Sequence, residues 1–86
     1  MPRQQILTET QTTSDVFKFR IADPTILLDN FQSGDPWKLQ ARSPQGEWVD
    51  TDLDFKEAGG GKLDVEVELE YRLTGGAVGA RAWIFH

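Results

Sequence analysis

Residues 62–73, KLDVEVELEYRL, alternate apolar and charged side chains without a break. Successive side chains of an extended strand point to opposite faces, so this period of two favours a half-buried β-strand over a helix. The apolar face holds Leu63, Val65, Val67, Leu69 and Tyr71. The charged face holds Asp64, Glu66, Glu68, Glu70 and Arg72. We predict one long strand whose apolar side chains enter a core and whose carboxylates face outward.

Shorter apolar runs, separated by turn formers, continue the β pattern along the chain. They predict further strands over 16–21, 25–30, 37–42, 47–55 and 77–85. SPQG, residues 43–46, has Pro at the second position and Gly at the fourth, which is the residue preference of a type I turn closing a hairpin. The glycine-rich stretch KEAGGGK, residues 56–62, predicts a flexible loop.

These runs lie at fairly even intervals, and no helical period interrupts them. Six or seven short strands of this kind are typical of an antiparallel β-sandwich, and an immunoglobulin-like sandwich without the cysteine pair of antibody domains is the leading hypothesis. Residues 1–14 contain one short apolar pair, Ile6 and Leu7. They predict a flexible N-terminal arm outside the core, which leaves residues 15–86 as the sandwich domain.

Composition narrows the classes of function. The chain has 86 residues, no cysteine and a net charge of −5, so it has neither disulfides nor thiolate metal sites. Phosphate binding needs a basic patch, so nucleic acid is not an expected partner. No stretch approaches the roughly 20 apolar residues of a membrane span, and the first ten residues lack the apolar run of a signal peptide, so we expect no membrane partner.

Residues suited to catalysis or metal binding are few. The only histidine is His86, the last residue of the sequence, and the serines lie in polar or turn contexts. We therefore predict no catalytic site and no cofactor. Asp50, Asp52 and Asp54 have the spacing of the first ligands of a calcium loop, but Phe55 stands where that loop needs glycine. We predict no metal site.

Aromatic and acidic residues supply the candidates for binding. Trp37 and Trp48 flank the predicted hairpin and form either a carbohydrate platform or part of the core, and the core is favoured. Trp83 and Phe85 alternate with Ala82 and Ile84, so one of the two faces would meet another chain or the N-terminal arm. The row of carboxylates is either solvated surface or a docking face for a basic partner. The candidate partner interface is Glu66, Glu68, Glu70, Trp83 and Phe85.

YRLTGGAVGARAWIF, residues 71–85, resembles the end of small β-sandwich structural proteins of tailed bacteriophages. Those proteins often end with a strand carrying a Tyr-Arg pair, a short turn, a Gly-Ala-Val-Gly stretch and a closing hydrophobic strand. Many also have an upstream hairpin motif that Gly46, Trp48 and Val49 match. The resemblance covers roughly residues 37–86 and does not extend to the N-terminus.

The resemblance implies a non-enzymatic virion protein, made in the host cytoplasm. The leading expectation is a capsid decoration or cement protein on the outside of the head. Its partners would be the major capsid protein and sister copies of the chain, assembled as a homotrimer. The alternative is a tail or baseplate module of the same fold that binds host-surface carbohydrate through Trp37 or Trp48. An accessory domain of a bacterial enzyme is a third hypothesis.

Overall fold

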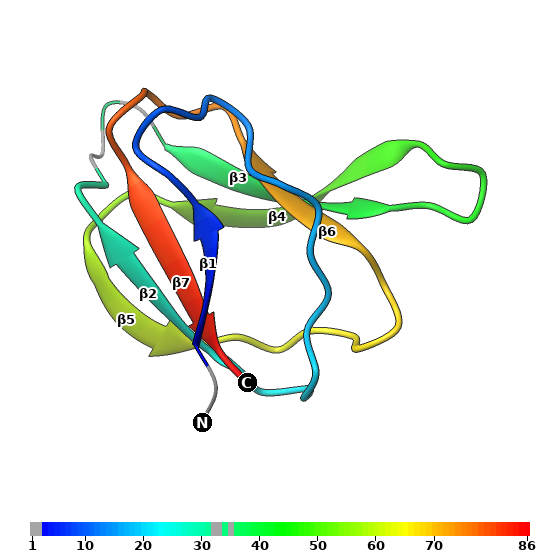
Figure 1. Cartoon of the computed structure of the whole chain (residues 1–86). Coiled ribbons are helices and arrows are strands. Elements are labelled where there is room, and N and C mark those ends of the chain that lie inside the picture. The colour runs from blue at the N-terminus through cyan, green and yellow to red at the C-terminus, as the bar shows by residue number, and fades with distance from the viewer. Residues whose placement is uncertain (1–2, 32–33, 35) are drawn as a thin grey trace.

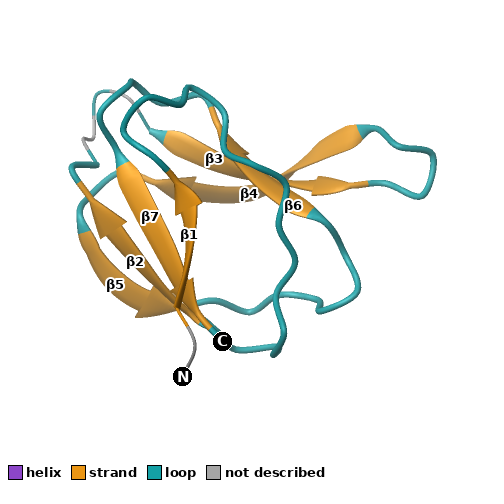
Figure 2. Ribbon diagram, in the orientation of Figure 1, coloured by secondary structure: helices purple, strands orange, loops and turns teal. Residues whose placement is uncertain are grey.

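Two antiparallel β-sheets make up the computed structural model, which describes residues 3–31, 34 and 36–86. These residues form seven strands and no helix (Figure 1, Figure 2). The four-stranded sheet has the order β1 (Arg3–Leu7), β7 (Arg81–Phe85), β2 (Thr25–Asp29), β5 (Gly59–Lys62). The three-stranded sheet has the order β4 (Trp48–Phe55), β3 (Trp37–Arg42), β6 (Tyr71–Thr74). The predicted all-β, sandwich-like architecture is confirmed.

The core lies between the inner faces of the two sheets. Ile26 and Ile84 enter it from the four-stranded sheet, and Leu39 and Leu73 enter it from the three-stranded sheet. Trp37 is 1% exposed and packs against Phe31, with ring centroids 6.1 Å apart. Removal of each such side chain from water contributes roughly 1.5–3 kcal/mol to folding.

The β3–β4 hairpin follows its sequence signal closely. The Gly46 amide donates to the Ser43 carbonyl at 2.9 Å, and Gly46 has φ of 89°, a left-handed conformation that glycine adopts without strain. The Ser43 amide donates to the Glu47 carbonyl at 2.7 Å and closes the hairpin. In Figure 1 the outer end of this hairpin, in green, extends beyond the rest of the molecule. The predicted turn is confirmed.

The long strand predicted over residues 62–73 is wrong. Residues 59–62 form β5 in one sheet and residues 71–74 form β6 in the other. Residues 63–70 cross between the sheets, in yellow in Figure 1. The two ends of the predicted strand pair in different sheets, and residues 63–70 between them form no strand, so the period of two shows only which side chains tend to face inward. The period does not identify every inward side chain correctly either, because Val65 is 6% exposed whereas Val67, on the same predicted face, is 40% exposed.

The glycine-rich stretch predicted as a loop instead contributes β5, an edge strand. Its residues pair with β2, and Gly60 stands opposite Leu27. Strand pairing uses the backbone amide and carbonyl groups, which glycine has like most other residues. A strand can therefore form where the side chains show no alternating pattern. The β5 strand therefore extends the four-stranded sheet beyond its apolar strands.

The N-terminal segment also differs from its prediction. Residues 3–7 form β1, and Ile6 and Leu7 are buried in the core. Gln5 pairs with Trp83 and Leu7 with Ala82, so Ile6 is an extra residue in a β-bulge. The bulge lets two consecutive side chains turn inward, and this explains why no alternation is visible in the sequence. Residues 1 and 2 of the predicted arm lie outside the described residues.

The segment predicted as a strand over 16–21 lines the edge of β6 without forming one. Phe17 and Tyr71 exchange two backbone hydrogen bonds of 3.0 and 2.8 Å. The Ser14 hydroxyl accepts from the Leu73 amide at 2.8 Å. The rings of Phe17, Phe19 and Tyr71 cluster with centroids 5.2–6.4 Å apart. The apolar residues of this segment therefore reach the core from a chain that covers a sheet edge.

The last strand, β7, lies in the interior of its sheet, between β1 and β2. In the common immunoglobulin order the last strand joins the three-stranded sheet instead. The position of β7 decides which side chains reach the surface, because alternate residues of a central strand face the core and the outside. Ala82 and Ile84 face inward, and Arg81, Trp83 and Phe85 face outward.

Candidate functional site

The outer face of the four-stranded sheet carries an apolar strip made of Leu27, Trp83 and Phe85. Trp83 stands directly opposite Leu27 on β2, and Phe85 stands opposite Thr25. Leu27 is 40% exposed, and the two aromatic side chains are half-buried. A central strand thus presents two large aromatic side chains outward beside an exposed leucine. Aromatic residues on a rigid surface are the usual anchors of protein–protein contacts.

Polar groups surround the apolar strip. The Arg81 guanidinium pairs with Asp29 and lies 5.5 Å from the centroid of the Trp83 ring. Arg3 and Lys62 stand opposite Phe85 and Thr25 on the neighbouring strands. Gly60 stands opposite Leu27 on β5 and adds no side chain to that flank of the apolar strip. An apolar centre within a polar rim is the arrangement of a typical binding surface.

The two tryptophans of the β3–β4 hairpin lie on opposite faces of their sheet. Trp37 is in the core, as favoured from the sequence, whereas Trp48 stands opposite Arg42 on the outer face. The favoured prediction that both tryptophans belong to the core is wrong for Trp48, because the register of the hairpin pairs it with the outward residue Arg42. The Arg42 and Arg72 guanidiniums lie 5.4 and 4.5 Å from its ring centroid. The two rings therefore form no joint platform for a sugar.

The charged and polar side chains around Trp48 form ion pairs and a hydrogen bond with one another. Lys38 and Asp50 approach to 3.6 Å, and Arg72 Nε donates to Gln40 Oε1 at 2.8 Å. Glu70, one of the carboxylates of the predicted row, lies 3.5 Å from Arg42. Exposed pairs of this kind are each worth less than about 1 kcal/mol, so the network orders this face more than it stabilises the fold.

The three glutamates of the predicted row do not form one continuous acidic surface. Glu70 pairs within its own chain, and Glu66 and Glu68 are exposed on the crossing segment, whose residues 67–69 make a turn and bend. No straight strand aligns the three carboxylates. None of the ion pairs among the described residues includes Glu66 or Glu68.

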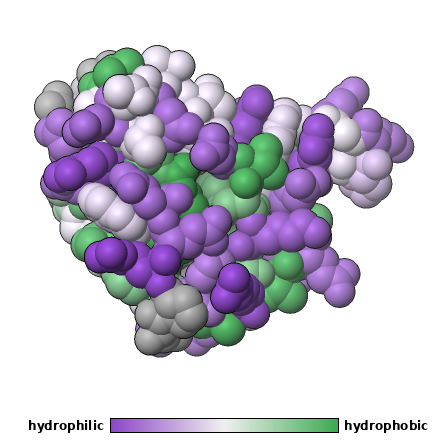
Figure 3. All heavy atoms as spheres, viewed as in Figure 1, coloured by the Kyte–Doolittle hydropathy of each residue, from purple (hydrophilic) through white to green (hydrophobic). Residues whose placement is uncertain are grey.

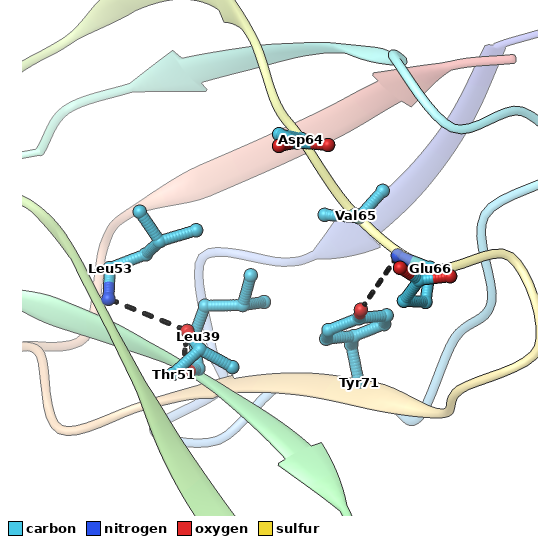
Figure 4. A pocket seen from close by; sticks show the side chains of 7 residues that line it. All are labelled: Leu39, Thr51, Leu53, Asp64, Val65, Glu66 and Tyr71. Atoms are coloured by element: carbon cyan, nitrogen blue, oxygen red, sulfur yellow. Dashed lines mark hydrogen bonds between the residues drawn. The ribbon is translucent and has the colours of Figure 1, made fainter.

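A cavity of about 450 Å³ lies where the crossing segment passes the inner face of the three-stranded sheet (Figure 4). We call it the acidic cavity, because two of its lining residues carry carboxylates. Its lining is Leu39, Thr51, Leu53, Asp64, Val65, Glu66 and Tyr71. This cavity has no local sequence signal, because its walls come from β3, β4, the crossing segment and β6. Figure 3 shows that hydrophilic residues cover most of the face in view, with apolar residues near its middle and in smaller groups toward its edges.

His86 is buried and bonded at both ring nitrogens. Nδ1 accepts from the Arg20 amide at 3.0 Å, so Nε2 carries the proton and donates to Gln4 Oε1 at 3.0 Å. Burial, and after it the positive charge of Arg20, lower the pKa of His86 below its ordinary value. The ring therefore joins β1, β7 and the segment before β2 in its neutral form.

The aspartates of residues 50–54 do not share one face. Opposite Leu39, β4 has three residues, Thr51 to Leu53, and Asp52 has φ of 67°. The Asp52 amide donates to Asp50 Oδ1 at 2.9 Å within this bulge. In the described part of the chain, no group of three or more His, Cys, Asp or Glu side chains is placed to hold a metal ion. Across those same residues, no helix has the length and apolar character of a membrane span.

Comparison of the chain with protein-family models, with curated proteins and with solved structures finds no match.

Proposed function

We propose that this chain is a non-enzymatic protein-binding module of a bacteriophage virion, acting as a decoration or cement protein on the outside of the head. The observation that carries the binding role is the apolar strip, because its three side chains share one outward face of a rigid sheet. The bacteriophage setting comes from the resemblance of residues 37–86. The partners would be the major capsid protein and sister copies in a homotrimer, with the host cytoplasm as the place of synthesis.

Interface energetics support the apolar strip as the docking surface. Tryptophan residues are enriched among side chains whose truncation weakens binding, often by about 2 kcal/mol or more. Trp83 is held by a central strand and by the Arg81 guanidinium over its ring, so little ordering remains to be done on binding. The polar rim at Arg3 and Lys62 would meet acidic groups of a partner and set its orientation.

An immunoglobulin-like relationship is part of the same proposal. The pairs β2–β5 and β3–β6 are those that the second and fifth, and the third and sixth, strands make in that fold. The placement of β7 in the four-stranded sheet and of β4 beside β3 would be departures from it. The carbohydrate alternative has less support, because Trp37 is buried and guanidinium groups lie over the Trp48 ring.

The virion role is tested by mass spectrometry of purified particles of the phage whose genome encodes this chain. We expect the chain in the particles at a copy number comparable to that of the major capsid protein. Brief mild chelator or salt treatment that strips outer proteins should release it before the capsid opens. Absence of the chain from purified particles would contradict the virion role.

A further inference from the structure

We infer that the acidic cavity binds a lysine or arginine side chain of a partner protein. The inference rests on the proposed protein-binding role and names the chemistry of a second contact, away from the apolar strip. It follows from three properties of the cavity: an apolar floor, two carboxylates that form no ion pair among the described residues, and walls held by hydrogen bonds.

The floor suits the aliphatic part of a long side chain. Leu39, Val65 and Tyr71 are all buried, and Leu53, 38% exposed, forms part of the wall. The volume of about 450 Å³ lies in the range of roughly 300–1,000 Å³ that ligand cavities occupy. Lysine and arginine bury their methylene stems along apolar surface while the charged end stays near water.

The charge of the lining selects a cation. Asp64 and Glu66 are exposed lining residues, and no ion pair among the described residues includes either of them. The chain as a whole carries a net charge of −5, which adds to the attraction. A guanidinium or ammonium group would form charge-assisted hydrogen bonds with these carboxylates, whereas an anion would be repelled and an apolar group would leave them unpaired.

The walls are fixed before any ligand arrives. The Glu66 amide donates to the Tyr71 hydroxyl at 3.1 Å, and the Val65 amide donates to the Ala22 carbonyl at 3.1 Å. Across the cavity, Thr51 Oγ1 donates to the Leu39 carbonyl at 2.8 Å (Figure 4). A preformed site binds without a large ordering cost. These bonds hold the backbone of the crossing segment, which carries Asp64 and Glu66, beside the apolar floor.

The test is a titration of the full ¹⁵N-labelled chain with acetylated, amidated pentapeptides, followed by amide chemical shifts. The peptides are Gly-Gly-X-Gly-Gly with arginine, lysine, norleucine or glutamate at X. We expect saturable shifts at Val65, Glu66 and Tyr71 with arginine and lysine, at dissociation constants on the order of millimolar, and binding about tenfold weaker with norleucine. Raising the salt concentration should weaken the arginine complex. Equal shifts with norleucine and arginine, or no saturable shift at these amides, would overturn the inference.

A charge-matched pair of variants locates the site. Asp64→Asn with Glu66→Gln should abolish the arginine-dependent shifts, whereas Glu9→Gln with Glu57→Gln removes the same charge elsewhere and should retain them. Retained shifts in the first variant would overturn the inference. The wild-type comparison of arginine with norleucine decides the matter even if a variant folds poorly. Failure here leaves the apolar strip unaffected, because binding of virions through Trp83 is measured separately.

Discussion

Replacement of Val65 and Val67 by aspartate, one at a time, tests how residues 63–70 cross between the sheets. The two valines are two positions apart in the apolar ladder, so a continuous strand would bury both equally. In the structure Val65 is 6% exposed and Val67 is 40% exposed. The sequence pattern alone would have Val67→Asp unfold the protein, and the structure predicts that only Val65→Asp does so.

The difference in unfolding free energy follows from burial. Val65→Asp loses most of the roughly 1.5–3 kcal/mol that a buried valine contributes, and it places a carboxylate among Leu39 and Tyr71 without a cation. The sum exceeds about 3 kcal/mol, a large part of the roughly 5–15 kcal/mol that stabilises a small domain. Val67→Asp removes a side chain that is already partly in water, so we expect a loss of about 1 kcal/mol.

Urea denaturation followed by tryptophan fluorescence measures both free energies, because Trp37 is buried in the core. The variants Val65→Ala and Val67→Ala separate packing from charge: the first should cost about 2 kcal/mol and the second clearly less. Equal losses for Val65→Asp and Val67→Asp would refute the crossing segment and restore a single long strand.

Other substitutions test separate elements. Leu7→Ala should cost about 2–5 kcal/mol in urea denaturation, because β1 belongs to the core, and a loss below about 0.5 kcal/mol would mean a detached arm. Gly46→Ala should cost about 1–3 kcal/mol because φ is 89°, whereas Gly61→Ala, without a positive φ, should be neutral or slightly stabilising by the same measurement; equal effects would contradict the turn. Because the pKa of His86 is lowered in the folded chain, the unfolded chain takes up a proton on this ring at a higher pH than the folded chain does. The stabilisation that the neutral, bonded ring contributes is therefore present above about pH 6.5 and is lost as the pH falls through the folded pKa. Melting temperatures across that range should therefore fall more steeply for wild type than for His86→Gln, and parallel curves would contradict the neutral, bonded ring.

Local signals predicted the parts of the fold that local chemistry controls. The hairpin of β3 and β4 was predicted because proline and glycine fit their turn positions and because Trp37 and Leu39 alternate with polar neighbours. A last strand was predicted within residues 77–85 because apolar residues run through that stretch, and β7 lies there. Each of these inferences needs only residues that are close together in the sequence.

The errors have a common physical origin in long-range pairing. A period of two shows which side chains turn inward and does not show to which sheet a segment belongs, so the ladder of residues 62–73 predicted a strand where the chain crosses. The glycines of β5 carry no side-chain pattern, and the bulge at Ile6 removes the alternation from β1. Pairing partners distant in sequence decide all three.

The candidate interface was predicted in part for the same reason. Trp83 and Phe85 were chosen because they alternate with core residues, and the structure places both on the outer face, although their contact with a partner stays a prediction. Glu70 was chosen with Glu66 and Glu68, but it pairs with Arg42 once the sheet brings the two together. The acidic cavity had no local signal, because Leu39, Thr51 and Glu66 meet only in the folded chain.

Under the proposed virion role, binding of purified variants to stripped virions tests the central claim, that the apolar strip docks onto a partner protein. Trp83→Ala removes the largest side chain of the apolar strip, and Trp48→Ala is the matched control on the other sheet. With both variants folded by circular dichroism, sedimentation should show that Trp83→Ala binds at least about thirtyfold more weakly than wild type, corresponding to about 2 kcal/mol, and that Trp48→Ala binds like wild type. Equal binding by Trp83→Ala and wild type would contradict the claim.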